Sequence, residues 1–231
     1  MSNRISPPPT LHTLLEGRAG LELNQLLVSL PLMRMGTPHG QGRVLVLPGF
    51  MNDDRITWPL RRFLQSLGYE PYPWDLGISR APMFDYLPKL LDRAQALSDE
   101  GPILLVGYSR GGVLAREMAR ERPELFRGVV TEGSPIRGGA EATQIGAFAA
   151  RQTGLPVETL RRLQEERGRI PIPVPIRILY SKTDGIVAWR ACIDESNEDV
   201  RHTEVKGSHA GLMVNTQVYR VVARELAELA A

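Results

Sequence analysis

The stretch 103-ILLVGYSRGGVLAREMA-119 runs from an apolar strand pattern through Gly-Tyr-Ser-Arg-Gly into a helical pattern. Ser109 stands at the centre of this G-x-S-x-G motif, between Gly107 and Gly111. In a sharp strand–turn–helix junction the two chains approach so closely that side chains at the glycine positions would collide. The turn also holds the serine in a strained conformation with its hydroxyl presented at the strand end. The stretch therefore predicts a nucleophile at Ser109, with a plain glycine-rich turn as the alternative.

Strand and helix patterns alternate on both sides of this junction. Short β-branched and leucine-rich runs predict buried strands, and amphipathic runs between them predict helices. The expected strands cover residues 43–48, 69–74, 102–107, 127–132, 176–181 and 200–206, and the expected helices cover about 57–67, 83–99, 110–121 and 214–230. This order predicts an α/β fold with a mostly parallel sheet of about six strands flanked by helices.

An insertion interrupts the alternation between the fourth and fifth strands. Residues 137–175 contain helical patterns near 141–151 and 157–167 and end in the extended run 170-IPIPVP-175. A connection of this length in a compact domain is usually functional. We therefore expect a small helical cap above the carboxyl ends of the strands.

A separate amphipathic segment precedes the first strand. Leucines recur at near-helical spacing within residues 11–33, at positions 11, 14, 15, 23, 26, 27 and 30, while Gly17 and Gly20 favour two shorter helical pieces. We expect residues 1–42 to form a helical segment whose leucines pack on the domain of residues 43–231. Contact with a lipid surface or a role in substrate entry is the alternative.

The composition is that of an ordinary globular protein, with 42% apolar and 23% charged residues and a formal net charge of +2. This charge gives no reason to expect nucleic-acid binding. The single cysteine, Cys192, permits no internal disulfide and is expected to be a small buried residue. With neither a secretory signal nor an apolar run of the roughly 18 residues that a membrane span needs, we expect a cytoplasmic protein.

Five motifs together resemble the α/β-hydrolase superfamily, and within it the small bacterial lipases and esterases. They are 44-VLVLPGF-50, 104-LLVGYSRGG-112, 129-VVTEGSP-135, 179-LYSKTDGIV-187 and 207-GSHAGL-212. The resemblance covers nearly all of the chain from about residue 43. It implies an α/β-hydrolase fold and a catalytic order of serine, acid and histidine.

Two histidines follow Ser109, namely His202 and His209. His202 lies within the last predicted strand, whereas His209 follows that strand, where the family places its catalytic histidine. Asp184 follows the fifth strand in a loop at the carboxyl end of the sheet, where open α/β sheets place catalytic groups. The resemblance therefore implies Ser109, Asp184 and His209 as catalytic residues. Asp184 could instead be an ordinary turn residue, and Glu132 is the rival acid, with a rim pairing to Arg110 or Arg137 as its other expected role.

An oxyanion hole needs two N–H groups aimed at the developing negative charge. One is expected from Arg110, directly after the nucleophile and at the start of a helix. The resemblance implies that Phe50, after the first strand, donates the other. The family commonly has His-Gly in this loop, and this chain has Pro48-Gly49.

These residues favour a serine hydrolase that cleaves small-molecule or lipid-like esters through an acyl-enzyme. An acyltransferase or thioesterase could use the same three residues, and a silent binding protein on this fold is the alternative from another class. Neither a cluster of metal ligands nor a G-x-G-x-x-G loop follows any predicted strand, so we expect neither a metal nor an organic cofactor.

Overall fold

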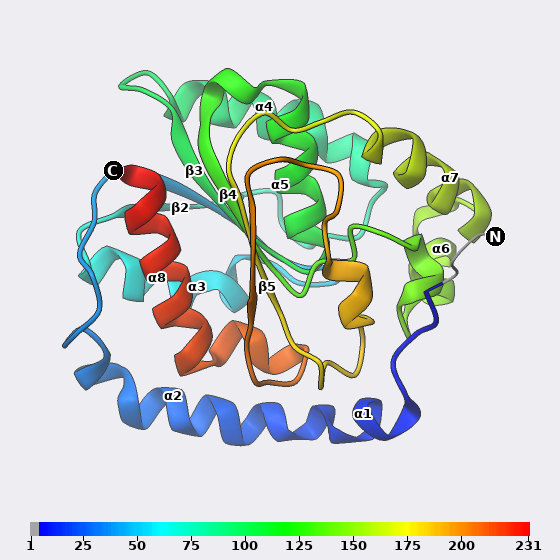
Figure 1. Ribbon diagram of the computed structural model, residues 1–231, viewed down its shortest axis with the longest axis horizontal. Helices are drawn as coiled ribbons and strands as arrows, with labels where there is room; N and C mark the ends of the chain where they lie inside the picture. Colours follow the sequence, from blue (N-terminus) through cyan, green and yellow to red (C-terminus); the bar gives the residue numbers. More distant parts are fainter. Residues whose placement is uncertain (1–4) are drawn as a thin grey trace.

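A six-stranded parallel sheet forms the centre of the computed structural model, which describes residues 5–231 (Figure 1). The strand order is β2-β1-β3-β4-β5-β6, and every neighbouring pair is parallel. The strands are β1 (Arg43–Leu47), β2 (Glu70–Pro73), β3 (Ile103–Tyr108), β4 (Phe126–Glu132), β5 (Ile176–Tyr180) and β6 (Val200–Glu204). The sequence-based prediction of the fold class is thereby confirmed, and all six strand positions are right to within two residues at each end.

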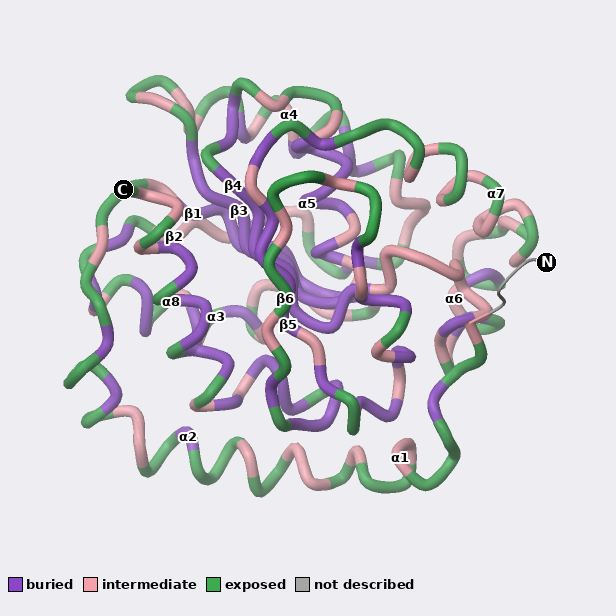
Figure 2. Tube along the Cα trace, in the orientation of Figure 1, coloured by how far each residue is buried: buried purple, intermediate pink, exposed green. Residues whose placement is uncertain are grey.

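Helices cover both faces of the sheet. On one face lie α3 (Asp54–Ser66) and α8 (Thr216–Ala230), which bury Leu60, Phe63 and Tyr219 against the sheet. On the other lie α4 (Met83–Leu97) and α5 (Arg110–Glu121), whose Leu90 and Met118 belong to the second core cluster. Strands β1, β3 and β4 are therefore buried on both sides (Figure 2). This double cover explains why their sequences are continuously apolar rather than alternating.

The insertion between β4 and β5 is helical, as the sequence predicts, but its first helix begins later. A 3-10 turn, η3 (Gly139–Ala142), is followed by α6 (Gly146–Thr153) and α7 (Val157–Gly168). The expected helix over 141–151 is wrong at its start because Thr143 is extended and forms an isolated antiparallel bridge with Val187. That bridge ties the insertion to the loop after β5.

The segment before β1 consists of α1 (Thr10–Leu14), the 3-10 turn η1 (Leu15–Arg18) and α2 (Ala19–Met33). It runs along the lower edge of the molecule in Figure 1, where α2 contacts α8 and the 3-10 turn η5 (Ala210–Val214). The change to 3-10 geometry includes Gly17, one of the two glycines expected to interrupt a single helix.

Only part of the leucine pattern of this segment packs on the domain. Leu26 and Met33 are buried, and Leu30 packs against the core. The other apolar residues face solvent, namely Leu11, Leu14, Leu15, Leu21, Leu23, Leu27, Val28, Leu32 and Met35. Of the leucines expected to pack on the domain, Leu26 and Leu30 do so and the others face solvent, because much of the inward side of the segment is polar. No helix among residues 5–231 is long and apolar enough to cross a membrane.

Candidate active site

The junction between β3 and α5 has the tight geometry that its glycines suggest. Ser109 has φ 52° and ψ −119°, a backbone conformation that non-glycine residues rarely adopt. A Cβ on Gly107 would lie 2.5 Å from the carbonyl carbon of Gly111, and one on Gly111 would lie 2.7 Å from the carbonyl oxygen of Pro48. Such distances exclude any side chain at either position. The backbone therefore presents Ser109 at the carboxyl end of the sheet.

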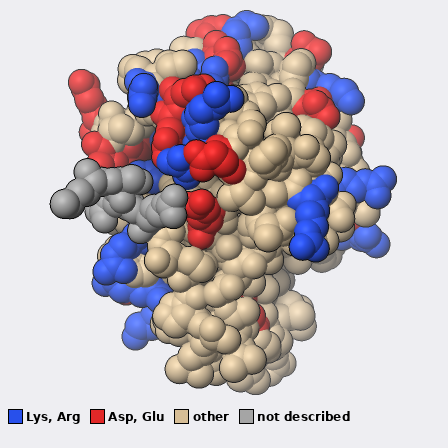
Figure 3. Space-filling view, turned by 90° about the vertical axis from the view of Figure 1, so that its right-hand side faces the viewer, with Lys and Arg blue, Asp and Glu red and all other residues tan. Residues whose placement is uncertain are grey.

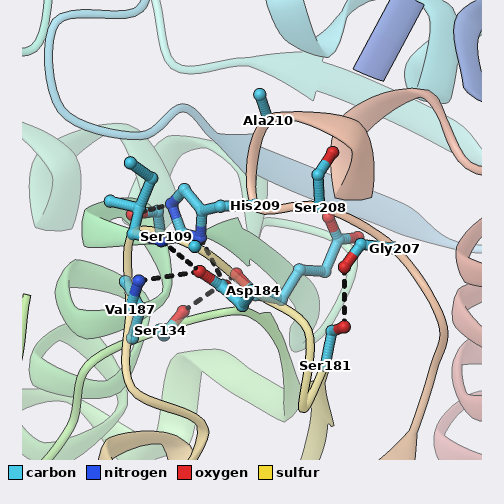
Figure 4. Close-up of polar contacts among 12 residues, drawn as sticks. Ser109, Ser134, Ser181, Asp184, Val187, Gly207, Ser208, His209 and Ala210 are labelled. Atoms are coloured by element: carbon cyan, nitrogen blue, oxygen red, sulfur yellow. Dashed lines mark hydrogen bonds and ion pairs between the residues drawn. The ribbon is translucent and has the colours of Figure 1, made fainter. Parts of the chain in front are cut away.

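Three sequence-predicted residues meet at this end of the sheet. The Nε2 atom of His209 lies 3.0 Å from Ser109 Oγ, and its Nδ1 atom lies 2.6 Å from Asp184 Oδ2. Figure 4 shows the imidazole ring between the serine and the carboxylate. All three side chains are buried, although 25 and 100 residues of chain separate His209 from its two partners.

Main-chain amides fix the Asp184 carboxylate in one orientation. Its Oδ1 atom accepts hydrogen bonds from the N–H groups of Ile186 at 2.8 Å and Val187 at 2.7 Å. Its other oxygen is left for His209. A carboxylate held in this way has one rotamer available, so it can hold the imidazole in one orientation and one tautomer.

The electrostatic surroundings favour a proton on His209. Burial lowers the pKa of its imidazole, but the charge of Asp184, the hydrogen bond to it and the charge of Glu16 outweigh burial and raise the pKa above its ordinary value. The ring also stacks at a tilt on Tyr108, at 5.1 Å between centroids. An imidazole in this setting can take up a proton and hold it as an ion pair with Asp184.

The loop after β1 packs directly against the serine. A Cβ on Gly49 would lie 3.3 Å from Ser109 Cβ, and the Met51 N–H donates to the carbonyl of Ser79 at 2.8 Å. Among the described residues, the main-chain N–H groups of Phe50 and Arg110 have no hydrogen-bond acceptor. Arg110 directly follows Ser109 in the chain, and Phe50 lines the same cavity as both of these residues.

An apolar cavity of about 180 Å³ opens beside Ser109. The loop after β1 and the insertion form its walls, and the Phe50 ring contacts the Phe148 ring of α6 edge to face at 5.9 Å. Its apolar lining includes Met83, Val113, Ile145, Leu160, Leu163 and Val187. Residues of the insertion and Ser109 therefore line the same cavity.

The two rival candidates, His202 and Glu132, do not belong to the hydrogen-bonded set of Ser109, His209 and Asp184. His202 is exposed on β6 and accepts a hydrogen bond from the Asp194 N–H at 3.0 Å. Glu132 is fully buried, and burial raises the pKa of its carboxyl to about 8. Its oxygens have no hydrogen-bond partner among residues 5–231, so the expected pairing with Arg110 or Arg137 is wrong. Those arginines instead bind Ala81 and Glu195.

Sequence reasoning missed one contributor, the carboxylate of Glu16. It accepts hydrogen bonds from the amides of the loops that carry Asp184 and His209. Nothing in a helical leucine pattern indicates that its charged residues face inward, so no signal in the sequence pointed to this role.

Within residues 5–231, no group of three or more His, Cys, Asp or Glu side chains could hold a metal ion. Cys192 is buried, and burial together with the charge of Asp184 raises the pKa of its thiol well above the ordinary value. The Ser109 hydroxyl, in contrast to the Cys192 thiol, lies within hydrogen-bond distance of an imidazole nitrogen, His209 Nε2.

The sequence model of the alpha/beta hydrolase family matches residues 44–225. Lipase LipV of Mycobacterium tuberculosis is 29% identical over 127 residues, which are 48% of this chain and 47% of that protein. The chain thus aligns with about half the length of that lipase.

The solved structures that share the fold include one from mouse and one from Paleococcus ferrophilus. Alpha/beta hydrolase domain-containing protein 10 from mouse is 19% identical with a TM-score of 0.60, over 81% of this chain and 88% of that one. A monoacylglycerol lipase from Paleococcus ferrophilus is 15% identical with a TM-score of 0.64, over 83% of this chain and 97% of that one. At these identities the likeness is one of fold.

Proposed function

Because the chain belongs to the alpha/beta hydrolase family, we propose that it cleaves carboxylic esters with Ser109, His209 and Asp184 as a catalytic triad. The observation that carries the proposal is the unbroken row of hydrogen bonds from the serine hydroxyl through the imidazole to the carboxylate. A lipase among its sequence relatives and another among its structural neighbours agree with ester substrates.

The proposed reaction has two halves. His209 Nε2 removes the proton of Ser109 Oγ as this oxygen attacks the ester carbonyl, while Asp184 holds the Nδ1–H and stabilises the imidazolium. The imidazolium then gives its proton to the departing alcohol, which leaves an acyl group on Ser109. Water, deprotonated by the same histidine, attacks the acyl-enzyme and releases the carboxylic acid.

The two unpaired amides would bind the oxyanion of each tetrahedral intermediate. The Arg110 N–H lies at the start of helix α5, where the helix dipole favours negative charge, and the Phe50 N–H would be the second donor, from the loop after β1. The Arg110 guanidinium is held by hydrogen bonds to the carbonyls of Ser79 and Ala81 and lies 5.4 Å from the centre of the Phe50 ring.

The cavity volume supports a short acyl group. About 180 Å³ is less than the roughly 300–1,000 Å³ of pockets that bind drug-sized ligands. In a panel of p-nitrophenyl esters we expect kcat/KM to be highest from acetyl to hexanoyl and to fall for dodecanoyl and longer chains. Leu163→Ala, which widens the cavity, should move the preference toward longer chains. No hydrolysis of any ester would contradict the proposed function, and an identical profile in both proteins would contradict the assignment of this cavity to the acyl group.

The outward apolar residues of α1 and α2 suit contact with a lipid aggregate that contains the ester. In Figure 3 the lower end of the molecule, where these helices lie, shows few charged side chains. A hydrolysis rate that rises above the solubility limit of the ester would support this contact. A rate that saturates with dissolved ester alone would contradict it.

The raised pKa of His209 sets the expected pH dependence. The general base must be neutral, so kcat/KM should fall as the pH decreases through the pKa of the free enzyme. Because Asp184 and Glu16 raise that pKa, the fall should begin at a higher pH than for an ordinary histidine of pKa 6.5. A profile of kcat/KM from pH 5 to pH 9 measures this, and a constant value over that range would contradict His209 as the base.

A further inference from the structure

The segment before β1 turns its polar side inward. Figure 3 and the exposure of Leu14, Leu21 and Val28 show an apolar outer surface, whereas Glu16 and Glu22 point at the domain. This is the reverse of an ordinary surface helix, in which apolar residues face the core. Partly buried carboxylates destabilise a fold unless donors satisfy them, so their partners explain the arrangement.

Those partners are main-chain amides of the two loops that carry the proposed acid and base. Glu16 Oε1 accepts from the Gly185 N–H and from the His209 N–H, each at 2.8 Å. Its Oε2 accepts from the Ala210 N–H at 2.9 Å. Gly185 directly follows Asp184, so one carboxylate joins the acid loop to the histidine's own backbone.

Neighbouring side chains of the segment bind the same loops. Thr13 Oγ1 donates to the Gly185 carbonyl at 2.7 Å, and Arg18 donates to the Thr183 carbonyl and hydroxyl, each at 2.7 Å. Glu22 accepts from the Ser208 N–H at 3.0 Å and from its hydroxyl at 3.2 Å. The contact is close, since a Cβ on Gly185 would lie 2.7 Å from the Thr13 nitrogen.

We propose, resting on the function proposed above, that Glu16 is a positioning residue that holds the Asp184 and His209 loops at their catalytic separation. Three N–H donors converge on its two oxygens, and only a carboxylate accepts at both oxygens without donating. Hydrogen bonds to an ionised acceptor are also stronger than those between neutral groups. A displacement of about 1 Å in such a site can lower the rate about 100-fold.

Besides its hydrogen bonds, Glu16 has an electrostatic effect on the pKa of His209. The titratable side chains that contact His209 among the described residues are Asp184, Tyr108 and Glu16, from the loop after β5, from β3 and from η1. The Glu16 charge raises the pKa of His209. This electrostatic effect depends on the charge of Glu16, whereas the positioning of the two loops depends on its hydrogen bonds.

Two substitutions separate the effect of the Glu16 hydrogen bonds to the two loops from the effect of its charge. In Glu16→Gln the remaining carbonyl oxygen can still accept hydrogen bonds from the N–H groups of Gly185 and His209, while the N–H of the exposed Ala210 can donate to water. We expect a loss of kcat of a few-fold and an acid limb of kcat/KM at lower pH, because the proton on His209 loses a nearby anion. Glu16→Ala removes both effects, and we expect kcat to fall about 10- to 100-fold with a smaller change in KM.

Glu22→Gln is the matched control. It makes the same change in charge on the same segment, and Glu22 pairs with Arg18 and Ser208. The groups that raise the pKa of His209 are Asp184 and Glu16, and Glu22 is not among them. We expect its acid limb to stay at the wild-type pH. Melting temperatures of all three variants show whether each is folded at the assay temperature. Wild-type kcat and an unshifted acid limb in both Glu16 variants would overturn the proposal.

A titration of the His209 ring by NMR separates this proposal from the proposed function. The pKa of the ring should be lower in Glu16→Gln than in the wild type and unchanged in Glu22→Gln, whether or not the protein hydrolyses an ester. Equal His209 pKa values in the wild type and Glu16→Gln would refute the effect of the Glu16 charge on His209. A lower His209 pKa in Glu16→Gln, without ester hydrolysis by the wild type, would support the effect of the Glu16 charge and refute the esterase assignment.

Discussion

Replacing Ser109 with alanine is expected to lower kcat for ester hydrolysis by a factor on the order of 10⁶ while the protein stays folded. The proposed reaction needs the Oγ atom to form the acyl-enzyme, and loss of a triad nucleophile has an effect of this size in other enzymes. Alanine keeps the Cβ atom and adopts the backbone conformation of Ser109 at a cost similar to that of serine. Steady-state kinetics and circular dichroism measure the two parts of this result.

Ser134→Ala is a suitable control for that substitution. Ser134 is also buried close to the β3–α5 junction, against Gly112, but its hydroxyl is bonded to the Glu132 carbonyl at 3.4 Å and not to His209. We expect this variant to keep its activity to within a few-fold. A folded Ser109→Ala protein with near wild-type turnover would contradict the acyl-enzyme mechanism.

Replacing Asp184 with asparagine is expected to lower kcat by a factor on the order of 10⁴. The amides of Ile186 and Val187 require an oxygen at the Oδ1 position, so the new amide nitrogen must face His209. The histidine would then accept a hydrogen bond at Nδ1 and carry its proton on Nε2. In that tautomer it cannot take the proton of Ser109. Kinetics at a pH above the acid limb measure the loss.

Glu132→Gln is the corresponding control for the rival acid. Glu132 has no hydrogen bond to His209, so we expect kcat to change by a few-fold at most. With a pKa of about 8 in the folded state and the ordinary value of 4.5 in the unfolded state, the folded protein holds a proton that the unfolded chain has released. The free energy of unfolding of the wild type should therefore decrease as the pH rises from 4.5 to about 8, and it should decrease less in Glu132→Gln. A severe loss of activity in Glu132→Gln with a mild one in Asp184→Asn would make Glu132 the acid.

Local patterns sufficed to predict most of the fold. Continuous apolar runs such as 103-ILLV-106 indicate strands buried on both faces, and a parallel sheet brings the carboxyl ends of these strands to one edge. Residues that directly follow strands, such as Ser109 and Asp184, can therefore be placed near one another from sequence. His209 is placed by its position between the last strand and the last helix.

Contacts that depend on tertiary packing could not be predicted in this way. Helical periodicity shows that residues 11–33 have two faces but not which face meets the domain, so the inward direction of Glu16 was missed. The charge of Glu132 suggested a surface pairing, yet the side chain lies within the sheet packing with no partner among the described residues. In both cases the position of a distant segment decides the environment of a charged residue.

The most direct test of the central claim is labelling with a fluorophosphonate, which reacts covalently with an activated serine. We expect one phosphonyl group per chain, which peptide mass spectrometry should locate on Ser109, and we expect no labelling of Ser109→Ala. The proposed role of His209 further requires the labelling rate to fall at acidic pH together with kcat/KM. An unlabelled wild-type protein, or a label on any residue other than Ser109, would contradict the assignment of Ser109 as the nucleophile of a serine hydrolase.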